Sequence, residues 1–212
     1  MRRAIRTAAV TIGLLLGLAS AAGARCPTRS SIQVVRVTPH AIVYERKGGY
    51  GATYACWLRN GRPHRINRPS EFGGFTPIDT LRFAGHFVAF QEDFESAAGF
   101  AQYWIVVRNL LDGSVLWEGQ ISERGGDYGD RSEILLVKRN GSVAWLVESG
   151  DEDDEDVFYR EVHIADRDHR GRLRERMLDQ YHRIRRNSLR MTADRRHVTW
   201  LHGTELRRAT FR

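Results

Sequence analysis

The chain has 212 residues, a length that suits one domain or one array of repeats with a sizeable core. Its 10% of aromatic residues and its 20 glycines fit many short strands and tight turns. No stretch beyond the N-terminus has the pattern of a long amphipathic helix, which argues against a helical protein. The formal net charge is +7, but Arg2, Arg3 and Arg6 carry three of these charges, so residues 25–212 hold only +4.

The first 24 residues have the pattern of a secretory signal peptide. Basic residues precede an apolar run from Ala8 to Ala22, and Ala22-Gly23-Ala24 is a small-residue cleavage site. The run is short for a membrane span, so we expect removal rather than anchoring. A single mature domain of residues 25–212, secreted or extracytoplasmic, is therefore predicted. Arg25 stands where a lipidation signal needs a small residue, so Cys26 is not expected to carry a lipid.

The chain has two cysteines, Cys26 and Cys56. In an exported protein an even number of cysteines indicates a disulfide, which here would tie the new N-terminus to a strand of the first repeat. Two separate free thiols are the alternative. A metal site is not expected from two cysteines so far apart in the chain without a pair of histidines nearby.

A short phrase that ends in an aromatic residue recurs at a spacing of 55 residues. A large apolar residue precedes each copy by seven positions: Leu81 precedes Val88-Ala89-Phe90, Leu136 precedes Val143-Ala144-Trp145, and Met191 precedes Val198-Thr199-Trp200. An earlier and weaker copy, Ile42-Val43-Tyr44, follows Val35 in the same way. A period of this length indicates supersecondary units that stack side by side.

Each copy begins with two strand-like runs separated by a short polar turn. Asn140-Gly141 is the strongest hairpin signal, because a type I′ turn needs positive φ at both central residues. A second pair of runs follows, separated by a glycine turn such as Asp112-Gly113. The unit is therefore a four-stranded antiparallel meander, and the last copy lacks one strand. The units fall at about 31–68, 76–120, 131–178 and 184–212.

These units predict an all-β fold of about four repeated four-stranded antiparallel meanders, arranged as a small β-propeller. The segment after Cys26 is expected to supply the missing last strand and to close the ring. A β-sandwich or an open propeller arc is the alternative arrangement.

An acidic run falls between the second and third strands of the third unit. Its carboxylates are weak candidates for binding a hard cation such as Ca²⁺, which takes six to eight oxygen ligands: Asp151, Asp153, Asp154 and Asp156. The run contains no glycine, so a solvated loop is the competing interpretation. Asp166 to Gly171 has three positions of a calcium loop, but Arg170 stands where a ligand belongs, so we predict a hairpin turn.

No residue is assigned to catalysis, to a metal or to a cofactor. The eight histidines form no H-x-x-x-H or H-E-x-x-H pair, and no serine stands in a G-x-S-x-G context. His40, His86 and His197 recur near the same turn of three units, which duplication explains. Residues 172–208 hold eleven arginines, for which solvent, the acidic run or an acidic envelope glycan are the candidate partners. Nucleic acid is not expected outside the cytoplasm.

The signal peptide, the cysteine pair, the phrase Gly85 to Phe90 and the run Val106 to Gly113 together resemble a class of exported, uncharacterised actinobacterial proteins. Those proteins have degenerate β-propeller repeats of the TolB or quinoprotein type. The resemblance extends over most of residues 25–212 and implies blades rather than an activity. The Trp-docking and glycine motifs of quinoprotein propellers are not evident, so no quinone cofactor is expected, and no catalytic residues follow from the resemblance.

We expect an exported, non-enzymatic binding or scaffold module of the cell envelope, with a protein or an acidic glycan as its partner. Two alternatives remain. One is an extracytoplasmic hydrolase that acts on a glycan or another polymer, and the other is a degenerate propeller with a purely structural role.

Overall fold

The computed structural model describes residues 25–48, 51–70, 75–95, 101–122, 131–150 and 158–212. These residues form four separate antiparallel sheets and one short 3-10 turn, η1 (Arg29–Ser31). Each sheet is a meander in which strands adjacent in sequence pair with one another, so the predicted all-β, propeller-like fold is confirmed. No helix within the described ranges is long and apolar enough to cross a membrane.

The strands of the first sheet are β1 (Ile32–Val37), β2 (Ala41–Arg46), β3 (Thr53–Trp57) and β4 (Pro63–Arg65). The second sheet contains β5 (Ile78–Ala84), β6 (Phe87–Glu95), β7 (Ala101–Asn109) and β8 (Val115–Gln120). The third contains β9 (Arg131–Val137), β10 (Val143–Gly150), β11 (Phe158–Arg167) and β12 (Leu173–Tyr181). The fourth has three strands, β13 (Arg190–Met191), β14 (His197–His202) and β15 (Glu205–Thr210).

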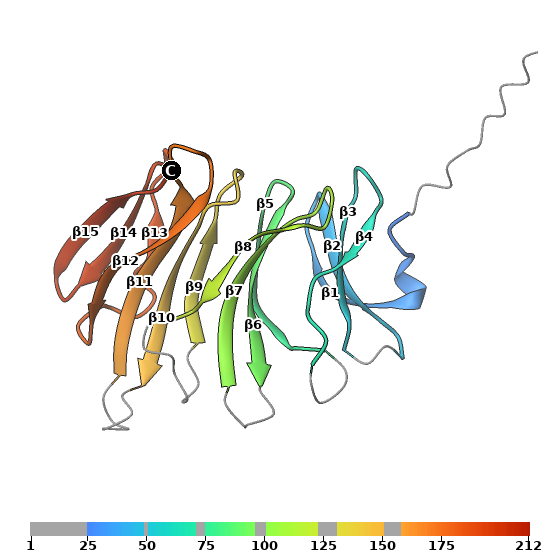
Figure 1. The fold of residues 1–212 in the computed structure, drawn as a ribbon, viewed down its shortest axis with the longest axis horizontal. Coiled ribbons are helices and arrows are strands. Elements are labelled where there is room, and N and C mark those ends of the chain that lie inside the picture. The colour runs from blue at the N-terminus through green and yellow to red at the C-terminus, as the bar shows by residue number, and fades with distance from the viewer. Residues whose placement is uncertain (1–24, 49–50, 71–74, 96–100, 123–130, 151–157) are drawn as a thin grey trace, which may run out of the picture.

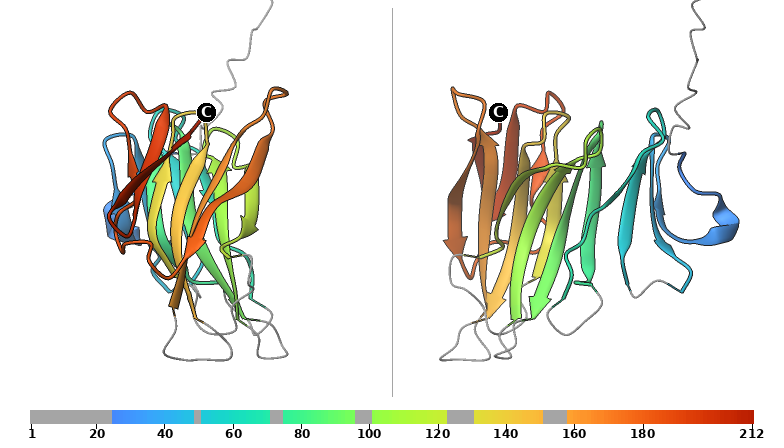
Figure 2. Two further views of the ribbon diagram at one scale, coloured as in Figure 1. Left: turned by 90° about the vertical axis from the view of Figure 1, so that its left-hand side faces the viewer. Right: turned by 45° about the vertical axis from the view of Figure 1, so that its right-hand side comes forward.

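The four sheets stand side by side in chain order, with β1–β4 at one end of the row and β13–β15 at the other (Figures 1 and 2). Between the second and third sheets the first strands approach one another, since β5 lies along β9, whereas the last strands β8 and β12 barely touch. The row is therefore an open propeller arc with its first strands on the inner side, and the β-sandwich alternative is wrong.

The recurring phrase lies on the second strand of each sheet, and its side chains pack against the two neighbouring sheets in a fixed order. Its valine and its aromatic residue are buried against the preceding sheet, in three cores that contain Val88 with Phe90, Val143 with Trp145, and Val198 with Trp200. The middle residue, Ala89 or Ala144, is buried against the following sheet, because neighbouring residues of a strand point to opposite faces. The residues that recur in the sequence therefore also occupy equivalent positions in the cores between the sheets.

The two ends of the row differ. At the first sheet, Ile42 and Tyr44 face the side where a preceding sheet would lie, and they pack instead around Cys56 with Cys26 of the N-terminal segment. At the fourth sheet, Thr199 stands where the second and third sheets have a buried alanine, and Leu206 is 67% exposed. The fourth sheet therefore ends the row with an uncovered face.

The predicted closure of the ring is wrong. The segment after Cys26 stays on its own sheet, where β1 pairs with β2, and no described residue pairs with the free edge of β15. The reason is the covalent bond at Cys26, which holds this segment at the opposite end of the row from β15.

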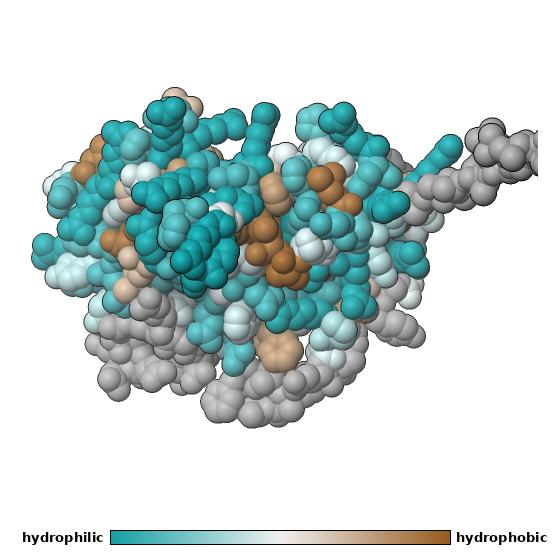
Figure 3. Space-filling view, turned by 45° about the horizontal axis from the view of Figure 1, so that its top comes forward, coloured by the Kyte–Doolittle hydropathy of each residue, from teal (hydrophilic) through white to brown (hydrophobic). Residues whose placement is uncertain are grey.

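The visible surface in Figure 3 is mainly hydrophilic, with a few hydrophobic residues gathered near its middle.

The predicted disulfide is present between Cys26 and Cys56, whose Cα atoms are 5.8 Å apart. Replacing both cysteines by serine is expected to lower the free energy of unfolding by about 3–4 kcal/mol, because the bond restricts the unfolded chain over a loop of this size. Urea denaturation of Cys26→Ser/Cys56→Ser measures the loss. Wild-type protein in dithiothreitol is the control and should unfold like the variant. An unchanged urea midpoint in the variant would contradict the expectation.

The hairpin between β9 and β10 forms where predicted, but its turn is not type I′. Gly141 has a φ of +86°, whereas Asn140 is not among the described residues with positive φ. The Gly141 N–H donates to the Lys138 carbonyl (3.0 Å), and the Lys138 N–H donates to the Ser142 carbonyl (2.8 Å). These bonds define a three-residue loop with a left-handed glycine at its end. A Cβ at Gly141 would also overlap Leu116 of the preceding sheet.

The turn between β11 and β12 has the same form, so the predicted hairpin turn at Asp166–Gly171 is confirmed. One carboxylate oxygen of Asp168 accepts the N–H groups of Arg172 (3.0 Å) and Arg170 (2.8 Å). These hydrogen bonds, the one from Arg172 above all, lower the pKa of the Asp168 carboxyl. The carboxylate therefore stabilises the turn itself.

Candidate functional site

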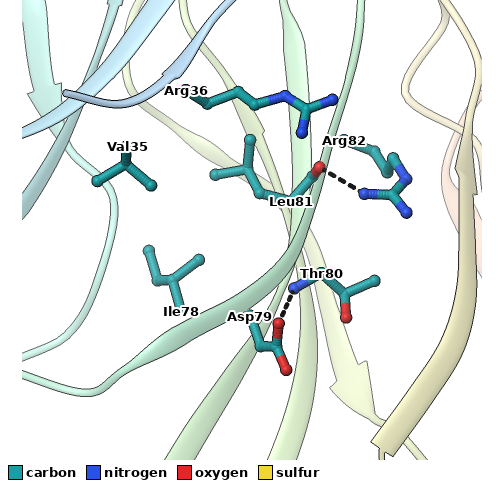
Figure 4. Close-up of a pocket in the computed structure, with 7 residues that line it drawn as sticks. All are labelled: Val35, Arg36, Ile78, Asp79, Thr80, Leu81 and Arg82. Carbon is teal, nitrogen blue, oxygen red and sulfur yellow. Dashed lines mark hydrogen bonds between the residues drawn. The ribbon is translucent and has the colours of Figure 1, made fainter.

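A pocket of about 370 Å³ opens between β1 and β5, the first strands of the first two sheets (Figure 4). It lies on the inner side of the arc, where a closed propeller would have its central channel. We call it the inner groove; its lining residues are Val35, Arg36, Ile78, Asp79, Thr80, Leu81 and Arg82. A concave site with an apolar floor and a few polar groups is the usual form of a binding site.

β1 forms an open wall of this groove. It is the edge strand of its sheet, and every residue from Gln33 to Val37 is exposed. Val34, Val35 and Val37 keep 40%, 49% and 47% of their surface accessible. An edge strand with exposed valines and backbone groups unpaired on one side is a template for another strand. The charge of Arg36 and the register shift between Val34 and Arg36 limit that tendency without removing it.

β5 forms the other wall, and its backbone is strained at Thr80. Thr80 has a φ of +47°, an unfavourable value for a β-branched residue. It lies in a register shift between Asp79 and Arg82, and the Asp79 carboxylate accepts its N–H at 2.6 Å. The Thr80 hydroxyl also donates to the Ser132 carbonyl of β9 (3.4 Å). Bulges and strained residues of this kind re-aim side chains and are concentrated at functional sites.

The charges of the inner groove are separated in space. Figure 4 shows Arg36 and Arg82 on one side of Leu81, and Asp79 with Thr80 on the other. Arg82 donates to the Leu81 carbonyl (2.9 Å), and within the described part of the chain neither guanidinium has a carboxylate partner. Two arginines against one aspartate favour an anionic ligand. The apolar side chains between them favour a ligand with a hydrophobic part.

A buried ionic cluster lies between the second and third sheets, away from the groove. The Nε2 atom of His163 is 2.8 Å from a Glu161 oxygen, and its Nδ1 atom is 3.3 Å from a Glu175 oxygen. The Trp145 ring stacks on the imidazole at 5.0 Å. Burial alone would lower the pKa of His163, but the two carboxylates outweigh burial and raise it. Because the imidazole and Glu161 are fully buried, this cluster stabilises the core rather than meeting a ligand.

Asp179 and His202 make an Asp–His pair of the kind found in hydrolases. Their closest atoms are 3.1 Å apart, but Asp179 also accepts from Trp200 Nε1 (2.6 Å) and Arg207 (2.8 Å). Burial tends to raise the pKa of Asp179, yet these hydrogen bonds and the Arg207 charge lower it overall. The carboxylate thus joins β12 to the β14–β15 hairpin. Among the described residues, the hydrogen-bond partner of the His202 imidazole is Asp179 itself.

The candidate cation ligands Asp151, Asp153, Asp154 and Asp156 lie outside the described residues. Within the described ranges, no three His, Cys, Asp or Glu side chains gather as a metal site would require. Arg36, Thr80 and Arg82 belong to no motif of the sequence that marks a site. The nearest signal in the sequence is the repeated apolar position at Val35 and Leu81, both of which line the groove.

No protein-family model matches the chain, and no curated protein sequence matches it. Among solved structures, it is similar to the beta-propeller domain of the Trilobed protease from Pyrococcus furiosus, which is described as having an open velcro topology. The identity is 17% and the TM-score is 0.43, over 59% of this chain and 33% of that chain. The chain thus spans about a third of the length of the solved chain it matches.

Proposed function

We propose that this protein is an exported, non-enzymatic binding module of the cell envelope, and that the inner groove receives its partner. The observation that carries the proposal is the open wall of β1 beside a pocket on the inner side of the arc. Export is supported by the signal-like N-terminus and by the Cys26–Cys56 disulfide, because such bonds persist in oxidising compartments.

The partner we propose is an extended polypeptide segment that carries acidic and apolar residues. The free edge of β1 offers backbone hydrogen bonds to an added strand, and the groove offers apolar contact at Val35 and Leu81. Arg36 and Arg82 supply two charges that a carboxylate of the segment would meet. The hydrolase alternative receives no comparable support, since the Asp179–His202 pair is engaged in holding the hairpin.

Fluorescence polarisation with short labelled peptides tests this proposal. We expect an alternating acidic–apolar peptide to bind, and Arg36→Glu or Arg82→Glu to weaken its binding at least about tenfold, because a charge-assisted hydrogen bond contributes about 1.5–3 kcal/mol. Arg170→Glu is the matched control, since Arg170 is an exposed arginine in the β11–β12 turn.

Four results would contradict the proposal. A lysine–apolar peptide that binds equally well would exclude charge recognition by the groove. Binding that is unchanged in Arg36→Glu and Arg82→Glu would move the site elsewhere. An acidic glycan that binds through both arginines while every peptide fails would replace the polypeptide partner with a carbohydrate. A purely structural role predicts no binding by any of these probes.

A further inference from the structure

A second cavity, which shares no lining residue with the inner groove, lies between the N-terminal segment and the first sheet. Its volume is about 350 Å³, and Arg25, Arg46 and Lys47 line it. None of its described lining residues is acidic. We propose that this cavity binds an oxyanion, a carboxylate or a phosphate, borne on a small organic body. We call it the N-terminal anion pocket.

The fold brings the three cations together from two parts of the chain. The disulfide fixes Cys26 against Cys56 of β3, so Arg25 lies beside the end of β2. Arg46 is the last residue of β2, and Lys47 begins the turn that follows. Because residues alternate along a strand, Arg46 lies on the same face as Tyr44, while Glu45 points to the opposite face. The neighbouring carboxylate therefore does not neutralise the pocket from within the strand.

The guanidinium of Arg46 is held in place by an aromatic ring. Its central carbon lies 5.0 Å from the centroid of Tyr54, and the Tyr54 ring stacks on Tyr44 at 5.6 Å. Tyr44 is itself 1% exposed and lines the pocket. A planar guanidinium oriented in this way can donate two parallel hydrogen bonds to a carboxylate or a phosphate. Orientation before binding reduces the entropy that the side chain would lose on binding.

The uncharged walls of the pocket indicate the chemistry of the organic part of the ligand. Pro27, Ile32 and Pro63 supply apolar surface beside the cations. Ser31 also lines the pocket, and its hydroxyl donates to the Thr28 carbonyl at 3.0 Å. A cavity of this volume has room for more than a bare oxyanion. A small sugar unit that carries one acidic group, with an apolar ring face toward the prolines, fits this combination of walls and charges.

Processing of the N-terminus would add a fourth positive charge. If the chain is cleaved after Ala24, as the export proposal requires, the α-ammonium group of Arg25 lies at this pocket. Only this extra charge rests on the proposed function, since the three side-chain cations are present whatever the chain's destination.

Isothermal titration calorimetry of the exported, processed protein tests the pocket, with mass spectrometry to establish its first residue. The probes are inorganic phosphate, glucose 6-phosphate, glucuronate and neutral glucose. We expect at least one of the organic anions to bind and glucose not to bind. Arg46→Gln/Lys47→Gln should weaken binding by at least about tenfold. Arg170→Gln, which removes an exposed arginine of the β11–β12 turn that lines neither pocket, is the matched control and should leave binding unchanged.

Competition identifies the anion. Inorganic phosphate that displaces glucose 6-phosphate assigns a phosphate site, whereas glucuronate binding that phosphate does not displace assigns a carboxylate site. The proposal is overturned if no anionic probe binds, if glucose binds equally well, or if the Arg46/Lys47 variant binds like wild type. Arg46 and Lys47 are exposed, so the variant should keep its fold, which near-ultraviolet circular dichroism checks. Failure of the peptide test at the inner groove would not affect these outcomes.

Discussion

Replacing Trp145 by alanine is expected to lower the free energy of unfolding by about 3–5 kcal/mol. The Trp145 side chain is fully buried between the second and third sheets, and its Nε1 donates to the Ile121 carbonyl at 2.8 Å. Its ring also contacts Trp117 at 5.5 Å and stacks on His163. The variant therefore creates a cavity, leaves the Ile121 carbonyl without this donor, and removes support from the ionic cluster.

Urea denaturation of Trp145→Ala measures this loss. Trp117→Ala is the matched control, because Trp117 packs against the same core but is only half-buried. We expect the control to lose clearly less stability than Trp145→Ala. Equal losses of unfolding free energy in the two variants would mean that the recurring aromatic residue stabilises the packing of the sheets no more than its half-buried neighbour does.

Replacing His163 by glutamine is expected to destabilise the protein by about 3–5 kcal/mol at mildly acidic pH, because it leaves the buried carboxylate of Glu161 without its cation. The pKa of His163 is raised in the folded protein, so the protonated imidazole stabilises the fold. That contribution is fully present below the ordinary histidine pKa of 6.5 and is lost as the pH rises through the raised pKa. Stability of the wild type should therefore fall with rising pH in this window.

Urea denaturation between about pH 5.5 and 8.5 separates the contribution of His163 from that of other groups. The difference in unfolding free energy between wild type and His163→Gln should be largest at the acidic end and should shrink at the alkaline end. His169→Gln is the control, since His169 is exposed in the β11–β12 turn. Parallel pH curves for wild type and His163→Gln would show that the buried imidazole is neutral.

The sequence predicted the sheets well because each unit carries its own local signals. The phrase around Val88, Val143 and Val198 marks the second strand of three sheets, and Gly141 marks a hairpin. Such signals depend on neighbours in the chain, on strand alternation and on turn geometry. The type of turn at Asn140 was mistaken, because two different loops can place glycine at a left-handed position.

Ring closure and the candidate sites could not be predicted in the same way. Whether the segment after Cys26 reaches β15 depends on the curvature of the row and on the disulfide, neither of which leaves a periodic pattern. The inner groove combines Arg36 of β1 with Thr80 of β5, residues that no motif connects. The N-terminal anion pocket likewise joins Arg25 to Arg46 through a covalent bond and a strand end.

The position of the disulfide also determines how the chain responds to mechanical tension. Cys26 and Cys56 enclose β1 and β2, so a force applied to the two termini passes through the bond and leaves those strands unstretched. At the other end β15 pairs with β14 alone among the described strands, and β13 is two residues long. A pulled chain should therefore peel open from its C-terminal sheet and keep its N-terminal hairpin folded until last.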